Sequence, residues 1–382
     1  MKTAKKIIRF ILMSIAVIVL LFGVYYVGLP GKKPHLNNDQ GMAFVKSMGS
    51  GINISASFDC FSMEEKPEGF DYETAWGQPH ISRKLIKSIA EAGMKTVRLP
   101  VTWSHNMGGA PDYTVNPVWM ARVKEVVDWI LAEEMYIILN TQNDDLFWQR
   151  FDRKYEDETL EVMSKLWEQI CKVFESEEYG EKLIFEPYNE PRKLDSFTEW
   201  MGGDIFNRAV VTRLNKKFLE IIRSHESHKE RWVLLPSYAA SSDFPAMWGM
   251  SVPEDDKVIV SLHIYHPLGF VSDRQPDNTV FTDRDAGVLK RKLANAHRMF
   301  VKKGIPVLIG EFGAVNKNNN AERAKFAAFF VKTAREYGMS CLWWDNGFWE
   351  VGSWPTNVFG VLDRESGTIA IPEIVAAIVD NS

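Results

Sequence analysis

The sequence has 382 residues, of which 46% are hydrophobic, so the chain is long enough to bury one large core. Its formal net charge is −5, and an acidic chain is a poor partner for nucleic acid, whose phosphates require clustered Lys and Arg. The three cysteines, Cys60, Cys171 and Cys341, lie far apart in the sequence, which excludes a disulfide-dense scaffold and a four-thiolate zinc site.

The amino-terminal segment predicts the cellular compartment in which the rest of the chain lies. Residues 10–29 carry no charge and follow a basic cluster formed by Lys2, Lys5, Lys6 and Arg9. At about 1.5 Å per residue this segment matches the roughly 30 Å hydrocarbon core of a bilayer, so residues 1–29 are predicted to be a retained membrane anchor or else a cleaved signal peptide. In both cases the basic flank stays on the cytoplasmic side of the membrane, and the rest of the chain is extracytoplasmic. Residues 30–45 are polar and are predicted to form a linker.

Residues 46–382 show no break in composition and are predicted to form one domain. Short apolar runs predict strands over Gly51–Ser55, Thr96–Pro100, Tyr136–Thr141, Leu183–Tyr188, Trp232–Pro236, Val258–Ile264, Pro306–Gly310 and Ser340–Trp344. Between them, apolar residues recur at three- and four-residue steps, which predicts helices over Ser82–Ala92, Asn116–Glu133, Asp157–Phe174, Phe206–Ser224, Asp285–Lys303 and Ala321–Tyr337. Shorter helices are expected over Phe244–Gly249 and Ile371–Asp380.

Strands that are apolar throughout and alternate with helices indicate a parallel sheet buried on both faces, and eight repeats favour its closed form, a (β/α)₈ TIM barrel. The active site of such a barrel lies at the carboxyl ends of the strands. Polar and aromatic residues occur at these positions in the sequence: Arg98, Asn189, Glu190, His263, Tyr265, Glu311, Trp343 and Trp344.

Glu190 and Glu311 suggest a chemistry. Cleavage of a glycosidic bond needs an acid for the departing oxygen, and a nucleophile or an activated water on the opposite face of the sugar, and two carboxyl groups in different environments provide both. Either glutamate alone is more simply explained as an exposed cap of the following helix. The pair, at two strand ends beside Arg98 and His263, instead predicts a glycoside hydrolase. This chemistry needs neither a metal nor a cofactor, and none is expected.

Six segments, in this order along the chain, resemble glycoside hydrolase family 5, the cellulase-type endoglucanases, and its subfamily of endoglucanases and xyloglucanases. The resemblance covers roughly residues 45–380. The segments are Glu73-Thr-Ala-Trp-Gly77, Val97-Arg-Leu-Pro-Val-Thr-Trp103, Leu183-Ile-Phe-Glu-Pro-Tyr-Asn-Glu-Pro-Arg192, Ser261-Leu-His-Ile-Tyr-His266, Gly304-Ile-Pro-Val-Leu-Ile-Gly-Glu-Phe-Gly-Ala-Val-Asn316 and Trp343-Trp-Asp-Asn-Gly347.

The resemblance implies a retaining, endo-acting hydrolase of β-1,4-linked polysaccharide, with Glu190 as acid/base and Glu311 as nucleophile. The polymer would be a β-glucan of the cellulose type, or xyloglucan or mannan, and the chain would act as a monomer. For retention, the two carboxyl groups should lie about 5 to 5.5 Å apart, whereas a separation beyond about 6.5 Å would indicate inversion.

The same resemblance implies roles for the neighbouring residues. Asn189 would bind the 2-hydroxyl of the sugar, and Arg98 would hold Glu311 ionised. Tyr265 would donate a hydrogen bond to Glu311, and His263 would help to set the protonation of the pair. One of Trp343 and Trp344 would form the floor of the adjacent sugar subsite, but not both, because successive strand residues point in opposite directions.

The sequence departs from the family at the third strand. The usual Asn-x-His-His-Glu run reads Asn140-Thr-Gln-Asn-Asp144 here, so Gln142 and Asn143 replace two imidazoles. Amides can still bind sugar hydroxyls but cannot take up a proton, so turnover, pH dependence or substrate preference is expected to change. The two amides leave open a weakened or non-catalytic polysaccharide-binding protein of the cell surface. A transglycosylase, which passes the sugar to another sugar and not to water, is a separate alternative.

Overall fold

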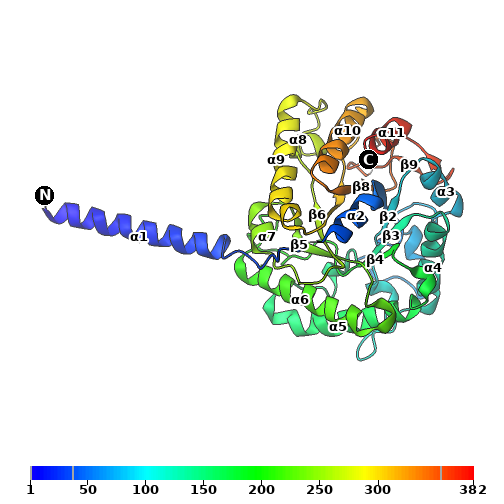
Figure 1. Cartoon of the computed structure of the whole chain (residues 1–382), viewed down its shortest axis with the longest axis horizontal. Helices are drawn as coiled ribbons and strands as arrows, with labels where there is room; N and C mark the ends of the chain where they lie inside the picture. The colour runs from blue at the N-terminus through cyan, green and yellow to red at the C-terminus, as the bar shows by residue number, and fades with distance from the viewer. Residues whose placement is uncertain (1, 37, 353–354) are drawn as a thin grey trace.

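The structure, a computed structural model, describes residues 2–36, 38–352 and 355–382. Eight parallel strands form a closed barrel in chain order, with the last strand paired to the first (Figure 1). This confirms the predicted (β/α)₈ barrel. The strands are β1 Gly51–Ile54, β2 Thr96–Leu99, β3 Tyr136–Asn140, β4 Leu183–Glu186, β5 Val233–Ser241, β6 Val258–His263, β7 Val307–Phe312 and β8 Ser340–Asp345.

Helices surround the barrel, and each helix predicted from the sequence is present within a few residues of its expected bounds (Figure 1). The helices around the barrel are α3 Arg83–Glu91, α4 Pro117–Ala132, α5 Glu156–Val173, α6 Ile205–Ser224, α7 Phe244–Gly249, α8 Leu268–Val271, α9 Asp283–Met299, α10 Asn320–Glu336 and α11 Pro372–Val379; of these, α8 was not predicted. Short 3₁₀ helices lie in the connections, at 72–74, 104–106, 144–146, 153–155, 177–179, 226–228 and 301–303, and β9 Leu362–Asp363 pairs with β10 Thr368–Ile369.

Local sequence signals explain where several helices begin and end. The Asn116 side chain accepts a hydrogen bond from the backbone N–H of Val118, and Pro117 occupies the first turn of α4. Thr282 and Asp285 form a reciprocal capping box at the start of α9. The chain leaves the short helix after α9 through Gly304, whose φ of 72° is left-handed.

Strand residues divide between two apolar layers because alternate side chains point to opposite faces. Ile137 and Leu139 of β3 pack in the large core between strands and helices. Ile138 belongs instead to a second cluster inside the barrel. This inner cluster comprises Ile138, Ile184, Leu234, Ile259, Leu308 and Leu342, together with Trp232 and three residues of α2, Phe44, Val45 and Met48.

Helix α2, Asp39–Met48, closes the end of the barrel at which the strands begin. Thr96 and Ser340, the first residues of β2 and β8, donate hydrogen bonds to the backbone oxygens of Met48 and Val45, each at 2.6 Å. Phe44 stacks on Trp232 with a centroid distance of 4.2 Å. The helix therefore seals the apolar interior opposite the carboxyl ends of the strands.

The segment at residues 30–45 is not the linker that the sequence predicts. The backbone N–H of Gly31 donates to Trp248 O at 2.8 Å, and that of Leu36 donates to Lys303 O at 3.0 Å. From Asp39 the segment is already α2. The polar composition concealed these contacts because they are made by backbone groups and by a few apolar side chains on one helix face.

Helix α1, Lys2–Tyr26, projects away from the barrel (Figure 1). Its large apolar side chains, such as Phe10 and Leu20, are exposed. Its last turn contacts the barrel, where the Tyr25 hydroxyl donates to Asp204 Oδ2 at 2.8 Å. Among the described residues, no helix is both long and apolar enough to span a bilayer. This finding gives no support to the predicted transmembrane segment at residues 10–29.

Candidate active site

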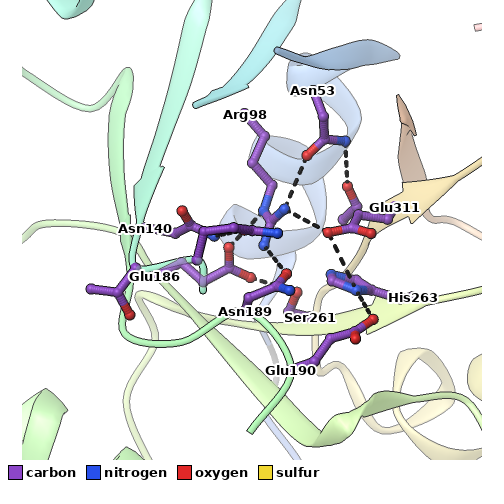
Figure 2. Close-up of polar contacts among 12 residues, drawn as sticks. Asn53, Arg98, Asn140, Glu186, Asn189, Glu190, Ser261, His263 and Glu311 are labelled. Carbon is purple, nitrogen blue, oxygen red and sulfur yellow. Dashed lines mark hydrogen bonds and ion pairs between the residues drawn. The ribbon is translucent and has the colours of Figure 1, made fainter. Parts of the chain in front are cut away.

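The inner face of the barrel changes from apolar to polar toward the carboxyl ends of the strands. β1 aligns with β2 at Asn53 and Arg98, and β3 aligns with β4 at Asn140 and Glu186. These four side chains are completely buried, and Ser261 of β6 joins them (Figure 2). Buried polar groups need hydrogen-bond partners. Asn53, Arg98, Glu186 and Ser261 are joined in one network, whereas Asn140 bonds to the Val101 backbone N–H and to Gln142.

Glu311 reaches the inner face through an irregularity of β7. Leu262 pairs with Ile309, but the next residue, His263, pairs with Glu311, so Gly310 is an extra residue in the strand. Strict alternation from the inward-facing Leu308 would have pointed Glu311 toward the helices. A Cβ atom on Gly310 would lie 3.1 Å from His263 Nε2, so only glycine fits without displacing that ring.

Both oxygens of Glu311 are hydrogen-bonded. Arg98 Nη1 donates to Oε1 at 2.8 Å, and the Tyr265 hydroxyl donates to Oε2 at 2.8 Å. The side chain is 6% exposed. Burial raises the pKa of Glu311, and Arg98 and the bond from Tyr265 oppose that rise because they stabilise the ionised form. The geometry thus holds a buried carboxylate in one orientation.

Glu190 follows β4 and lies in a different environment. Its side chain is 18% exposed, and its Oε1 lies 2.9 Å from His263 Nδ1. Burial raises the pKa of Glu190, while the charges of Arg192 and Arg98 lower it. Burial also lowers the pKa of His263 to about 4, so the ring is neutral near pH 7. Glu190 is therefore the carboxyl group of the pair that solvent reaches more easily.

The two glutamates lie close together (Figure 2). One carboxylate oxygen of Glu190, one of Glu311 and a ring nitrogen of His263 all lie within 4.8 Å of one another. This close approach of the two carboxyl groups is consistent with the short separation of retaining glycosidases, about 5 to 5.5 Å. The same three groups are close enough to hold a metal ion, and the expected absence of a metal stays a prediction.

Asn189 and Arg98 complete the contacts around the pair. Arg98 Nη2 donates to Asn189 Oδ1 at 2.9 Å. Together with the contacts above, the structure brings six of the residues predicted from the sequence into one cluster: Arg98, Asn189, Glu190, His263, Tyr265 and Glu311.

The structure distinguishes the two tryptophans of β8. Trp343 is 0% exposed, packs against Phe312 in the outer core layer and donates from Nε1 to Phe359 O at 3.1 Å. The Trp343 side chain therefore points toward the helices, so of the two tryptophans it is not the one that could contact a sugar. Trp344, one residue further, aligns with the inward-facing Asn53 and is partly exposed. Only Trp344 is placed to contact a ligand at the mouth of the barrel.

The two amides that replace the family's imidazoles are both held by the protein. Gln142 is buried, and its Oε1 accepts a hydrogen bond from Asn140 Nδ2 at 2.9 Å. Asn143 donates from Nδ2 to the backbone oxygen of Asp59 at 2.8 Å. Asn143 therefore ties the loop after β3 to the loop after β1, whereas the Gln142 side chain bonds within the end of β3.

Of the two glutamates, Glu190 is the more exposed to solvent. A cavity of about 910 Å³ lies on the outer wall of the barrel, next to Tyr72, Arg122 and Trp129, and neither Glu190 nor Glu311 lines it. Access to the glutamates is through the exposed side of Glu190, at the carboxyl ends of the strands.

Three buried residues of the network were not predicted from the sequence: Asn53, Glu186 and Ser261. Arg98 Nη1 donates to Asn53 Oδ1 at 3.0 Å, and Arg98 Nε donates to Glu186 Oε2 at 2.7 Å. Ser261 Oγ donates to Glu186 Oε1 at 2.8 Å. The signal was present, because a charged or amide side chain within an otherwise apolar strand must have a buried partner.

Comparisons with known proteins agree with this geometry. Residues 61–349 match the model of the family "Cellulase (glycosyl hydrolase family 5)". Endoglucanase A of Ruminococcus albus is 35% identical over 346 residues, which are 89% of this chain and 92% of that protein. A solved broad-specificity endoglucanase from Clostridium acetobutylicum is 38% identical, with a TM-score of 0.82 over 89% of this chain and 99% of that one.

A further solved structure is a xyloglucan-specific endo-β-1,4-glucanase from a metagenomic library, in complex with cellotriose. It is 29% identical, with a TM-score of 0.85, and the match covers 91% of this chain and 100% of that one. The family match spans most of the barrel, and both the sequences and the structures agree over nearly the whole length of these relatives. The chain belongs to glycosyl hydrolase family 5 and is an endo-acting glycoside hydrolase.

Proposed function

We propose that this protein is an endo-β-1,4-glucanase that retains the anomeric configuration, with Glu311 as nucleophile and Glu190 as acid/base. The observation that carries the proposal is the close pair of carboxyl groups, with one oxygen of each within 4.8 Å of the other. One group is hydrogen-bonded by Arg98 and Tyr265, and the other is partly open to solvent. The different environments assign the two roles, since a nucleophile must be ionised and an acid must keep its proton.

The reaction has two steps. In the first, a Glu311 oxygen attacks the anomeric carbon, the bond from that carbon to the leaving oxygen breaks, and Glu190 gives its proton to this oxygen. In the second, Glu190 removes a proton from a water whose oxygen attacks the same carbon and releases Glu311. Asn189 uses its Oδ1 to accept from Arg98, and its amide Nδ2 is therefore the group that would donate to the sugar 2-hydroxyl.

The substrate we propose is a β-1,4-glucan backbone, either plain or branched as in xyloglucan. The solved relatives support this choice, because one is described as a broad-specificity endoglucanase and another as xyloglucan-specific with cellotriose bound. The test is incubation of the purified chain with soluble cellulose derivatives, xyloglucan and mannan, followed by assay of reducing ends and by NMR of the first product. We expect cleavage within the polymer, and new reducing ends that are initially in the β configuration. Initial α products, or no cleavage of any β-1,4-linked polymer, would contradict the proposal.

Trp344 and Trp343 form a matched pair for testing the sugar subsite. Trp344→Ala is expected to lower kcat/KM by roughly 10-fold to 100-fold through a higher KM, because an apolar platform for the sugar ring is lost. Trp343→Ala should instead lower the free energy of unfolding by about 3–5 kcal/mol, because it leaves a cavity in the core. Kinetics and urea unfolding of both variants measure the difference. Equal effects of the two variants on KM would contradict the placement of Trp344 at the substrate.

Arg192 offers a test of the acid/base assignment through pH. Its Nη1 donates to the backbone oxygen of Glu190 at 3.0 Å, and its charge lowers the pKa of Glu190. Arg192→Met should therefore raise that pKa, so that Glu190 keeps its proton to higher pH. In the plot of kcat/KM against pH, the alkaline limb should move to higher pH. Arg192→Lys, which keeps the charge, is the control and should move the limb less. An alkaline limb that moves downward in Arg192→Met would exclude Glu190 as the acid.

We also propose that the barrel acts outside the cytoplasm, with the amino-terminal segment directing export and either staying attached to the membrane or being removed. The uncharged residues 10–29 behind a basic cluster support this, as does a polymeric substrate that does not enter cells. Protease treatment of intact cells should degrade the barrel, and the mass of the mature amino terminus should separate retention from cleavage. A barrel that is protected in intact cells and released by lysis would contradict the proposal.

A further inference from the structure

A third glutamate lies in the network and takes no part in the two steps described above. Glu186, four residues before Glu190, is 0% exposed in its side chain and accepts hydrogen bonds from Arg98 Nε at 2.7 Å and from Ser261 Oγ at 2.8 Å (Figure 2). Arg98 is equally buried. One guanidinium group is thus shared between two carboxylates, Glu186 and Glu311, in the interior of the barrel.

The guanidinium of Arg98 meets a different partner at each nitrogen. Nε donates to Glu186, Nη1 to Glu311 and Asn53, and Nη2 to Asn189. Because the group is planar and its N–H directions are fixed, the bond at Nε determines how the two Nη atoms are presented. The position of Glu186 therefore controls the alignment of Arg98 with both Glu311 and Asn189.

The charge of Arg98 is balanced differently in the two halves of the reaction. While Glu311 is ionised, the buried cation has two negative neighbours. When Glu311 forms its ester with the sugar, it becomes neutral, but Arg98 stays charged. A buried ion that loses its partner is strongly disfavoured. At that stage, Glu186 is the anion that remains in contact with Arg98.

We propose that Glu186 is a positioning residue that acts as the permanent counter-ion of Arg98, aligning it with Glu311 and Asn189 and balancing its charge while Glu311 is esterified. This inference rests on the proposed role of Glu311 as nucleophile. Glu186 forms no bond to the sugar and transfers no proton, since the bond changes and the proton transfer stay with Glu311, Glu190 and water.

The proposal has a consequence for pH dependence. The charged or titratable groups that face Glu311 are Arg98 from β2, Glu190 after β4, and His263 and Tyr265 at the end of β6. Glu186 acts on Glu311 through Arg98, because its negative charge offsets part of the guanidinium's positive field. Removal of that charge should lower the pKa of Glu311 and make its ester less favourable.

The test is the isosteric variant Glu186→Gln, assayed with an aryl β-cellobioside across pH and by stopped flow. We expect kcat/KM to fall by roughly 100-fold and its acid limb to move to lower pH, because Glu311 stays ionised further into acid. The second step should not slow, so less of the covalent intermediate accumulates in the burst phase. Ser261→Ala is the matched control, since it removes a hydrogen bond to the same carboxylate and keeps the charge; its acid limb should stay in place.

Glu186→Asp separates charge from alignment and covers the case in which the glutamine variant does not fold. It keeps the negative charge but shortens the reach to Arg98, so the acid limb should remain near that of the wild type while kcat/KM falls. A loss of rate in Glu186→Gln without a shift of the acid limb would show a purely structural role and overturn the inference, as would wild-type kcat/KM in Glu186→Asp. Activity that survives in Glu311→Gln would instead refute the proposed function itself.

Discussion

Glu311→Gln is expected to lower kcat/KM on a soluble β-1,4-glucan by roughly 10⁵-fold or more, since loss of a catalytic nucleophile removes the covalent route entirely. In the wild type, Arg98 and Tyr265 donate hydrogen bonds to the two oxygens of Glu311. The amide of the variant is isosteric with the carboxylate, and its oxygen can still accept one of these bonds. Folding and binding of cello-oligosaccharides should therefore stay close to those of the wild type. Reducing-end assays, circular dichroism and calorimetry measure the three quantities.

Glu190→Gln is the companion variant that separates the two roles. An aryl cellobioside with an acidic phenol as leaving group does not need a proton donor in the first step, so Glu190→Gln should still release the phenol in a burst and then stall. Glu311→Gln should show no burst with this substrate. If Glu311→Gln gave the burst and Glu190→Gln did not, the assignments of nucleophile and acid would have to be exchanged.

Arg98→Met should produce the second largest effect, on stability and activity together. The substitution leaves Glu186 and Glu311 buried without their cation, and breaking a buried ion pair in this way costs about 3–5 kcal/mol of unfolding free energy. We expect kcat/KM to fall by roughly 10²-fold to 10³-fold as well, because a preorganised charge beside the reacting carboxylate is lost. The pKa of Glu311 should rise, so the acid limb of the pH profile moves upward.

Arg98→Lys is the control for Arg98→Met. An ammonium group keeps the charge but cannot reach Glu186, Glu311, Asn53 and Asn189 from one planar fork, so it should retain much of the stability and little of the alignment. Urea unfolding and kcat/KM as a function of pH provide the measurements. If Arg98→Met had the unfolding free energy and the acid limb of the wild type, Arg98 would not set the ionisation of Glu311.

The barrel could be predicted from the sequence because its strands are apolar on both faces and its helices are bounded by strong local signals. Asn116 and Pro117 stand at the start of α4, and Gly304 ends the short helix after α9. Helix α2 was missed because only Phe44, Val45 and Met48 reveal it, within a segment that is polar in composition. Its role depends on contacts with Trp232 and Leu342, far away in the sequence, which no local pattern records.

The site was predicted in part for the same physical reason. Strand ends of a parallel barrel converge, so Arg98, Glu190 and Glu311 could be expected to meet. The inward direction of Glu311 could not be derived from alternation, because it depends on the extra residue Gly310 in β7. Alternation did indicate that only one of Trp343 and Trp344 faces the substrate, but choosing between them required knowing that Leu342 lies inside the barrel.

The helical plug α2 also determines how this domain should be produced for study. The family match begins at residue 61, yet a fragment started there would lack β1 as well as Phe44, Val45 and Met48 of α2, so the barrel could not close and its apolar interior would be open to water beside Trp232. A recombinant boundary just before Tyr25 removes most of the exposed apolar helix and keeps the docked segment and the plug. Expression trials that follow the family limits alone would therefore be expected to yield aggregated protein.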